Sequence, residues 1–310
     1  MLWQMVLLCL IWGVNWAVMS TALDYFPPLT FSALRFVLGS VVLLAICFYK
    51  RIPWPDKQSW KWFALCGLLQ TAYVFSVTQS VLQYLSVGVT SILAFTMPLW
   101  VTILAHFFIP DERLKFAHIL GLSSGILGLF LVLDVNPLEM TWTGVTIVAQ
   151  LFVLSSSVAW ATSNIIIKKV LHAHDKIQFT TYQMLIGTVG LLLASFFVES
   201  WRPITWSWMA VFCLMFAGVI ASAIAYILWT NIISKGEAGR SSISLMAVPV
   251  IGALSGWVFL GETLAWKTMF GIFFVVAGIG IVNMKEFRTV KRSAADQNKE
   301  ISLHDEKGAM

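Results

Sequence analysis

The sequence predicts an all-α membrane protein with ten transmembrane helices, arranged as two inverted five-helix repeats. Three observations lead to this prediction: the apolar composition, the residue matches between the two halves of the chain, and the distribution of Lys and Arg. Of the 310 residues, 59% are hydrophobic and 11% are charged, and the mean hydropathy is +0.83. A soluble domain needs more polar residues to cover its surface. We therefore expect the chain to lie in a lipid bilayer.

A helix needs about 20 mostly apolar residues to cross a bilayer. The sequence has long, unbroken apolar stretches, whereas membrane β-barrels are built from short segments in which apolar and polar residues alternate. The ten predicted helices cover residues 3–21, 30–49, 62–81, 88–108, 116–133, 144–166, 178–198, 208–231, 241–260 and 265–284. The first stretch lacks a basic segment before it and a cleavage pattern after it, so it is interpreted as a membrane helix and not as a signal peptide. The polar stretch 285–310 is expected to be a disordered cytoplasmic tail.

The two halves of the chain match each other at nearly constant offsets, which indicates an internal repeat. The matched pairs include Trp12 with Trp160, Phe31 with Phe179 and Gly39 with Gly187 at an offset of 148, Gly67 with Gly218 and Pro98 with Pro249 at 151, and Gly121 with Gly271 and Gly128 with Gly278 at 150. The first repeat covers residues 1–136 and the second 141–284. Because each repeat has an odd number of predicted helices, the second must cross the membrane in the opposite direction. Inverted repeats of this kind are typical of transporters that work by alternating access.

Lys and Arg are concentrated in alternate loops. If the amino terminus is inside, 17 of the 20 lie in cytoplasmic loops or in the tail, Arg202 and Lys267 lie outside, and Arg35 lies within a helix. Cytoplasmic loops of membrane proteins carry such an excess. We therefore predict a multi-pass protein of the cell membrane with both termini in the cytoplasm. This topology also accounts for the net charge of +5, so no nucleic-acid partner is expected.

Patterns typical of enzymes and metal sites were not found in the sequence. The four cysteines lie within apolar stretches, where they are interpreted as core residues and not as disulfides or metal ligands. A phosphate-binding loop and a Gly-x-Ser-x-Gly motif are missing. We therefore expect no enzyme activity, no cofactor and no metal. A membrane channel or an embedded membrane enzyme remains an alternative to a transporter.

Several short motifs are distinctive, and the runs that begin at Pro98 and Pro249 occupy matched places in the two halves. The motifs are Trp12-Gly13-x-Asn15, Arg35-Phe36, the run from Pro98 to Asp111-Glu112, Gly-Ile-Leu-Gly at 125–128, and the run from Pro249 to Glu262. Over residues 1–284 they resemble the drug/metabolite transporter (DMT) superfamily, specifically its EamA-type ten-helix exporters. The resemblance implies export, or less often uptake, of small metabolites such as amino acids around a central cavity. The expected partners are this small-molecule solute and the bilayer, and a monomer is expected.

Arg35 is the one formally charged side chain deep inside the predicted spans, since Lys267 lies within three residues of the outer end of the span 265–284. A charge placed in hydrocarbon costs at least about 2.5 kcal/mol, so it needs water, a partner or a ligand. Two interpretations are open. The planar guanidinium could anchor a carboxylate of the solute, or it could extend to the membrane surface or pair with Asp24. Its counterpart in the second half, Gln183, is neutral.

Polar and aromatic residues at helical spacing predict faces that line a cavity. The predicted substrate-binding residues are Trp12, Asn15, Arg35, Ser76, Gln79, Gln83, Trp100, Trp160, Ser163, Asn164, Tyr226 and Trp229. Hydrogen bonds between neighbouring helices are the alternative interpretation for the small polar residues. Packing is the alternative for the aromatic ones.

Two prolines and two acids occupy matched positions. Pro98 and Pro249 are predicted to bend their helices in the middle and to act as hinges, with rigid packing kinks as the alternative. Glu112 and Glu262 precede the predicted helices 116–133 and 265–284. We interpret these two acids as caps of the helices that follow them.

Overall fold

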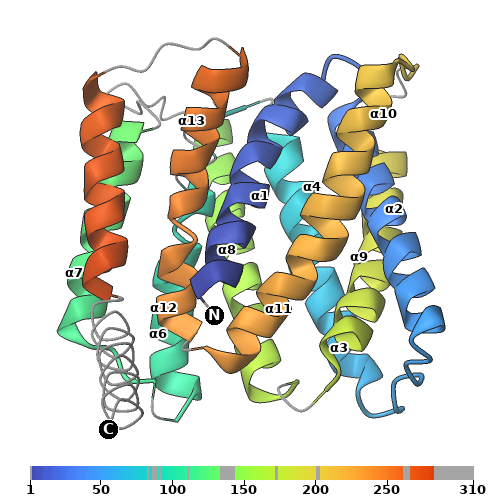
Figure 1. The fold of residues 1–310 in the computed structure, drawn as a ribbon, viewed down its shortest axis with the longest axis horizontal. Helices are drawn as coiled ribbons and strands as arrows, with labels where there is room; N and C mark the ends of the chain where they lie inside the picture. Colours follow the sequence, from blue (N-terminus) through green and yellow to red (C-terminus); the bar gives the residue numbers. More distant parts are fainter. Residues whose placement is uncertain are drawn as a thin grey trace, which may run out of the picture.

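The computed structural model describes residues 2–81, 84–85, 90, 93–110, 112–132, 144–171, 174–199, 203–236, 238–260 and 266–282. Within these ranges the regular structure is helical, without strands, and the long helices stand side by side (Figure 1). Six helices are long and apolar enough to cross a membrane: Leu2–Ala22, Pro28–Tyr49, Gly144–Lys169, Lys176–Val198, Trp208–Lys235 and Ala238–Ser255. Shorter apolar helices cover Met97–Phe108, Phe116–Leu131 and Trp266–Val282. The prediction of an all-α, multi-pass membrane protein is confirmed.

Helices α2 (Pro28–Tyr49) and α9 (Lys176–Val198) pack against each other along much of their length. A side chain from outside α2 accepts hydrogen bonds at the beginning of this helix. Glu199, just after α9, accepts hydrogen bonds from the backbone N–H groups of Leu29 (2.8 Å) and Thr30 (2.7 Å). The first N–H groups of a helix have no partner within it and carry partial positive charge, so a carboxylate stabilises them. Glu199 therefore ties the end of α9 to the beginning of α2.

Two further spans contain a π-helical segment in their middle. The first consists of α3 (Trp60–Cys66), the π-helical segment η1 (Gly67–Tyr73) and α4 (Val74–Ser80), and the second of α10 (Trp208–Met215), η4 (Phe216–Ile224) and α11 (Ala225–Lys235). A π-helical turn widens the backbone and often marks a functional site. The apolar sequence predicts ordinary helices here, because apolar composition does not distinguish the two helix types.

The helices that contain the two prolines are interrupted, not bent. A turn at Phe95–Thr96 precedes α6 (Met97–Phe108), and a turn at Leu245–Met246 separates α12 (Ala238–Ser244) from α13 (Ala247–Leu260). Pro98 and Pro249 lie in the first turn after each break. Proline is tolerated there because its missing N–H would have no partner within the helix. The prediction of a kink at the proline is thus wrong in detail, since the chain breaks before it.

The remaining helices complete the bundle. They are α1 (Leu2–Ala22), α7 (Phe116–Val132), α8 (Gly144–Lys169) and the helix over Trp266–Val282, which runs beside α7. Glycine allows this last pair to approach closely. A Cβ atom at Gly128 would lie 2.6 Å from the carbonyl oxygen of Gly271 and 2.8 Å from the backbone nitrogen of Val275.

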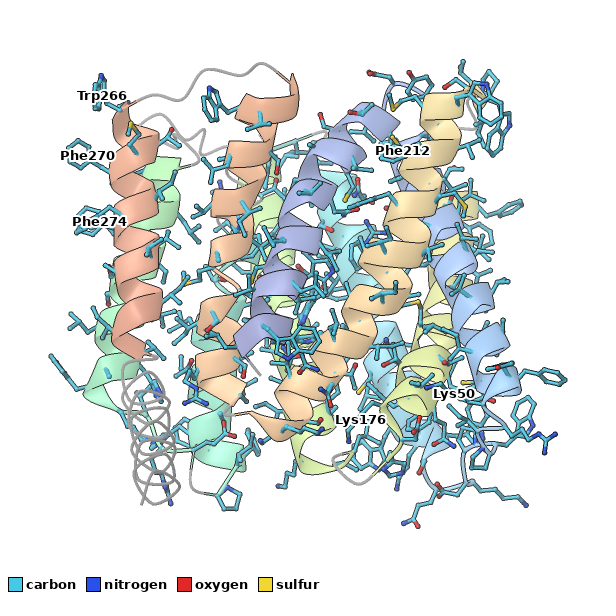
Figure 2. All side chains as sticks on the ribbon, in the orientation of Figure 1. Lys50, Lys176, Phe212, Trp266, Phe270 and Phe274 are labelled. Carbon is cyan, nitrogen blue, oxygen red and sulfur yellow. The ribbon has the colours of Figure 1, made fainter. Side chains whose placement is uncertain are left out.

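The two ends of the bundle differ in their side chains. Lys50 and Lys176 lie at one end and Trp266 at the other (Figure 2). We call these the lysine end and the tryptophan end. Between them, large apolar side chains such as Phe212 and Phe270 point outward and are exposed. Exposed apolar side chains in such numbers fit contact with lipid hydrocarbon.

Candidate central cavity

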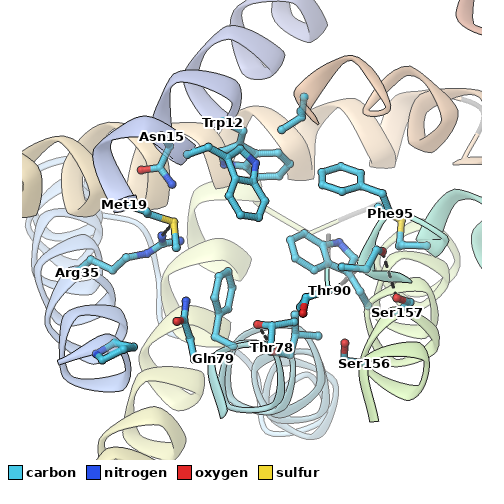
Figure 3. A pocket seen from close by; sticks show the side chains of 18 of the residues that line it. Trp12, Asn15, Met19, Arg35, Thr78, Gln79, Thr90, Phe95, Ser156 and Ser157 are labelled. Carbon is cyan, nitrogen blue, oxygen red and sulfur yellow. Dashed lines mark hydrogen bonds between the residues drawn. The ribbon is translucent and has the colours of Figure 1, made fainter. Parts of the chain in front are cut away.

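A cavity of about 280 Å³ lies in the middle of the bundle (Figure 3). Helices α1, α2, α4, α8 and α11 contribute to its lining, together with residues around the breaks before α6 and α13. Its walls are mainly apolar and aromatic. Polar side chains project from several helices, among them Asn15, Arg35, Gln79 and Ser156. A largely apolar cavity with a few converging polar groups is the usual form of a small-molecule site.

Arg35 reaches the cavity from α2 and is only 3% exposed. Its guanidinium carbon lies 4.7 Å from the ring centre of Phe36 and 4.9 Å from that of Phe75, and Nη1 lies 3.2 Å from the sulfur of Met19. In the described part of the chain, Arg35 makes no ion pair, and Asp24 is not its partner. Nε has no hydrogen-bond partner. Aromatic faces stabilise a cation less than a carboxylate does, so the guanidinium is left with free capacity for an anion.

Other polar atoms of the cavity also lack partners. They are Asn15 Oδ1, Gln79 Oε1, Trp160 Nε1 and the hydroxyl of Tyr226. Buried polar groups are nearly always hydrogen-bonded, and a group left without a partner costs about 1–3 kcal/mol. Several such atoms around one space fit a site completed by water or a solute.

Trp12 links the cavity to a π-helical segment. Its indole Nε1–H donates a hydrogen bond to the carbonyl oxygen of Ala221 in η4 (3.0 Å). The wider backbone of a π-helical turn presents a carbonyl group that side chains can reach. This contact holds the ring of Trp12 against Trp160 and Tyr226, with ring centres 6.1 and 5.8 Å apart.

The cavity is open toward the tryptophan end and closed toward the lysine end. On the open side it extends to Ser20 and Leu23, which are exposed near the end of α1. On the closed side, Trp12 packs on Trp229, which is completely buried, and the centres of the two rings are 6.2 Å apart. Beyond Trp229 lies a buried apolar cluster that includes Leu8 and Val101.

A polar network joins three segments at the closed end. Glu112 lies 3.5 Å from Lys168 Nζ and accepts a hydrogen bond from the backbone N–H of Ala238 (2.6 Å). Lys168 also donates to the carbonyl oxygen of Gly236. Glu112 therefore contacts the beginning of α12, a contact that the sequence did not suggest. Local spacing could not reveal this, because Ala238 is 126 residues away.

A second polar contact at the lysine end joins two loops. Ser59 lies 2.6 Å from His174 Nε2 and donates a hydrogen bond to Asp56. This hydrogen bond lowers the pKa of the Asp56 carboxyl. These loops follow α2 and α8, so the closed end is held at more than one place.

The predicted site residues fall into two groups. Those that line the cavity are Trp12, Asn15, Arg35, Gln79, Trp160 and Tyr226. Those outside the lining are Ser76, Trp100, Ser163, Asn164 and Trp229. Ser163 donates to Gln70 Oε1 (3.2 Å), and Asn164 accepts from Trp229 Nε1 (3.0 Å). Gln83 lies outside the described residues.

Some lining residues were not among the predicted ones. They include Met19, Phe75, Thr78, Thr90 and Ser157. Thr78 lies one position from Gln79 on α4 and could have been found from its polar spacing. Met19 and Phe75 are apolar and carry no such signal, although they hold the guanidinium of Arg35. Among the described residues, no cluster of His, Cys, Asp or Glu could hold a metal ion.

Comparison with known proteins finds matches over most of the chain. A model of the EamA-like transporter family matches residues 1–134 and 147–284. The uncharacterized transporter YoaV of Bacillus subtilis is 29% identical, over 87% of this chain and 92% of its own length. A probable amino-acid metabolite efflux pump of Salmonella typhimurium is 25% identical, over 93% and 95%. A solved crystal structure matches with a TM-score of 0.79 at 17% identity, over 91% of this chain and 96% of its own, which shows likeness of the fold.

Proposed function

The chain belongs to the EamA-like transporter family, and we propose that it is a secondary transporter that exports small amphipathic metabolites by alternating access. The observation that carries this proposal is a central cavity, open at one end, in which Arg35 Nε and several other polar atoms lack hydrogen-bond partners. Relatives named as probable amino-acid metabolite efflux pumps support the solute class and the direction. The six lining residues among the predicted ones would contact the solute, with Arg35 as the anchor for an anionic group.

Alternating access requires two halves that can exchange conformations. Residues separated by the repeat offsets touch each other, which supports a two-fold axis in the membrane plane. Ser40 Oγ lies 3.2 Å from Thr188 Oγ1, an interval of 148 residues. Ser124 Oγ donates to the carbonyl oxygen of Phe274, 150 residues away (2.8 Å). Residues that sit on such an axis meet their own counterparts.

The breaks before Pro98 and Pro249 supply mobile elements for this exchange. Broken helices beside a binding site are common in secondary transporters, because the free backbone groups can face a cavity. Phe95 and Leu245, one at each break, both line the cavity. A change at either break would therefore move the wall of the site.

The polar network around Glu112 would act as a lock that keeps the lysine end closed. Replacing Lys168 by Gln removes the ion pair between Lys168 and Glu112, and the expected loss of about 1.4 kcal/mol corresponds to about a tenfold shift toward the state open at that end. The shift is measured as the rate at which a cysteine placed at Ser157 reacts with an impermeant reagent added from the lysine side. Lys169→Gln is the matched control, because Lys169 is exposed. Equal rates in the two variants would contradict a lock at Lys168.

The proposed topology places the lysine end in the cytoplasm of the cell. We expect single cysteines in the loops 22–29 and 134–143 to react with an impermeant reagent outside intact cells, and cysteines in 170–176 to react only after permeabilisation. The excess of Lys and Arg is the physical reason, since positive loops are retained on the cytoplasmic side. The reverse labelling pattern would invert the proposed orientation.

Transport itself is tested by counterflow in proteoliposomes that contain the purified chain. Candidate solutes are those whose levels inside and outside the cell change in opposite directions when the gene is deleted or overexpressed. A carrier gives saturable flux that is accelerated by solute on the opposite side. Flux that does not saturate and shows no counterflow would favour a channel instead.

A further inference from the structure

The cavity has one formal charge in its described lining. Arg35 is the charged residue, and an arginine side chain stays protonated in proteins. The remaining lining residues are neutral, and no Asp or Glu is among them. The described lining of the cavity therefore carries a net charge of +1 in surroundings of low dielectric constant.

A buried charge without a counter-ion is unfavourable, and a single opposite charge beside it removes most of the penalty. A solute with one negative charge would make the occupied cavity neutral. A zwitterion would leave it at +1, and its ammonium would find only neutral acceptors such as Asn15 Oδ1 and aromatic faces such as Trp160. An ammonium group binds a neutral acceptor or an aromatic face more weakly than it binds a carboxylate.

The position of Arg35 strengthens this argument. The rings of Phe36 and Phe75 cover the guanidinium at 4.7 and 4.9 Å, and Met19 contacts Nη1. Of the donors on its planar edge, Nε has no partner. A planar anionic group can accept from two donors of this edge at once. Apolar walls are left for the rest of the solute.

We propose that the solute is an organic monoanion without an ammonium group, and that each transport cycle moves one net negative charge. This inference rests on the proposed transport function and names its solute class and driving force. An inside-negative membrane potential expels an anion, and 100 mV sustains a concentration ratio of about 50-fold for one charge. Export then needs no coupling ion, which agrees with the absence of acids from the described lining.

The experiment uses the full chain in proteoliposomes and 2-phenylethanesulfonate as the probe. A sulfonate stays anionic and does not cross lipid in a protonated form. The liposomes are loaded with labelled probe, and valinomycin with potassium gradients sets the potential. We expect the outside-to-inside ratio of the probe to rise from about 1 at zero potential to about 50 at 100 mV, inside negative. The potential acts on the solute charge, so the orientation of the protein in the liposome does not matter.

Competition separates the charge classes. Phenylalanine, as the zwitterion, and 2-phenylethanesulfonamide, as the neutral isostere, are expected to inhibit sulfonate flux at least tenfold less effectively than unlabelled sulfonate. Asn15→Asp places a carboxylate in the cavity and should reduce this preference by about tenfold or more. Gln79→Glu adds a carboxylate to the cavity from α4 and should reduce the preference in the same way. Gln58→Glu, which adds the same charge at an exposed position, should leave the preference unchanged.

The outcomes distinguish this inference from the proposed function. A sulfonate ratio that does not respond to the potential, or phenylalanine that competes as well as the sulfonate, would overturn the inference and leave transport intact. Equal preference in wild type and Asn15→Asp would do the same. Absence of flux for the sulfonate and for phenylalanine would contradict the proposed function as well.

Discussion

Replacing Arg35 by Gln is expected to weaken binding of an anionic solute at least tenfold. A hydrogen bond to a charged group contributes about 1.5–3 kcal/mol, which corresponds to a factor of about 10 or more in affinity. The loss should be specific to the anionic group, because Arg35 lies at one side of the cavity with Phe36 and Phe75 around it. An analogue without that group should bind wild type and variant equally well.

The variant is chosen so that the fold survives. Gln occupies the matched position 183 in the second half, where its side chain is completely buried. The measurement is the half-saturating concentration for efflux at matched expression, for the solute and for its neutral analogue. Lys50→Gln is the control, since it removes an exposed positive charge at the lysine end. If Arg35→Gln discriminates against the analogue as strongly as wild type, Arg35 is a structural residue.

Replacing Gly128 by Ala is expected to lower the free energy of unfolding by about 1–3 kcal/mol, the usual cost of overpacking a close contact. The new methyl group would lie 2.6 Å from the carbonyl oxygen of Gly271 and 2.7 Å from a methyl carbon of Val275. Backbone atoms cannot rotate away as a side chain can. Helix α7 and the helix over Trp266–Val282 must therefore separate.

Gly280 is the matched control for this prediction. It lies in the helix over Trp266–Val282, and a Cβ atom there would meet nothing within 4 Å. Gly280→Ala should keep or slightly raise stability, because Ala favours a helix by about 1 kcal/mol over Gly. Thermal unfolding of the purified protein in detergent gives the comparison. Equal midpoints for the two variants would show that the contact at Gly128 is not tight.

The helical membrane architecture was predictable from composition. A chain in lipid must satisfy its backbone hydrogen bonds internally, so a long apolar stretch has one regular structure open to it, the helix. The details inside the helices were not predictable in the same way. The π-helical segments η1 and η4 and the breaks before Pro98 and Pro249 depend on which backbone carbonyl groups find partners in neighbouring helices, as Ala221 does with Trp12.

The candidate site was predicted in part. Arg35 was predictable as a site residue because a charge in hydrocarbon needs water, a partner or a ligand, and the structure places it at the cavity. Ser163 and Asn164 share the polar character of the cavity residues, yet they lie outside the lining and form hydrogen bonds with Gln70 and Trp229. Helical spacing shows which residues share a face, but not what that face meets.

The sequence by itself determined that this chain is an apolar helical membrane protein with one charged side chain deep inside a predicted span. Those properties follow from composition, local spacing and the cost of burying charge, all of which are present in the chain before it folds. Only the tertiary structure decided which polar groups meet each other and which remain free. The pairing of Glu112 with Lys168 and the lack of a partner for Arg35 Nε depend on helices that are distant in sequence, and packing alone brings these together.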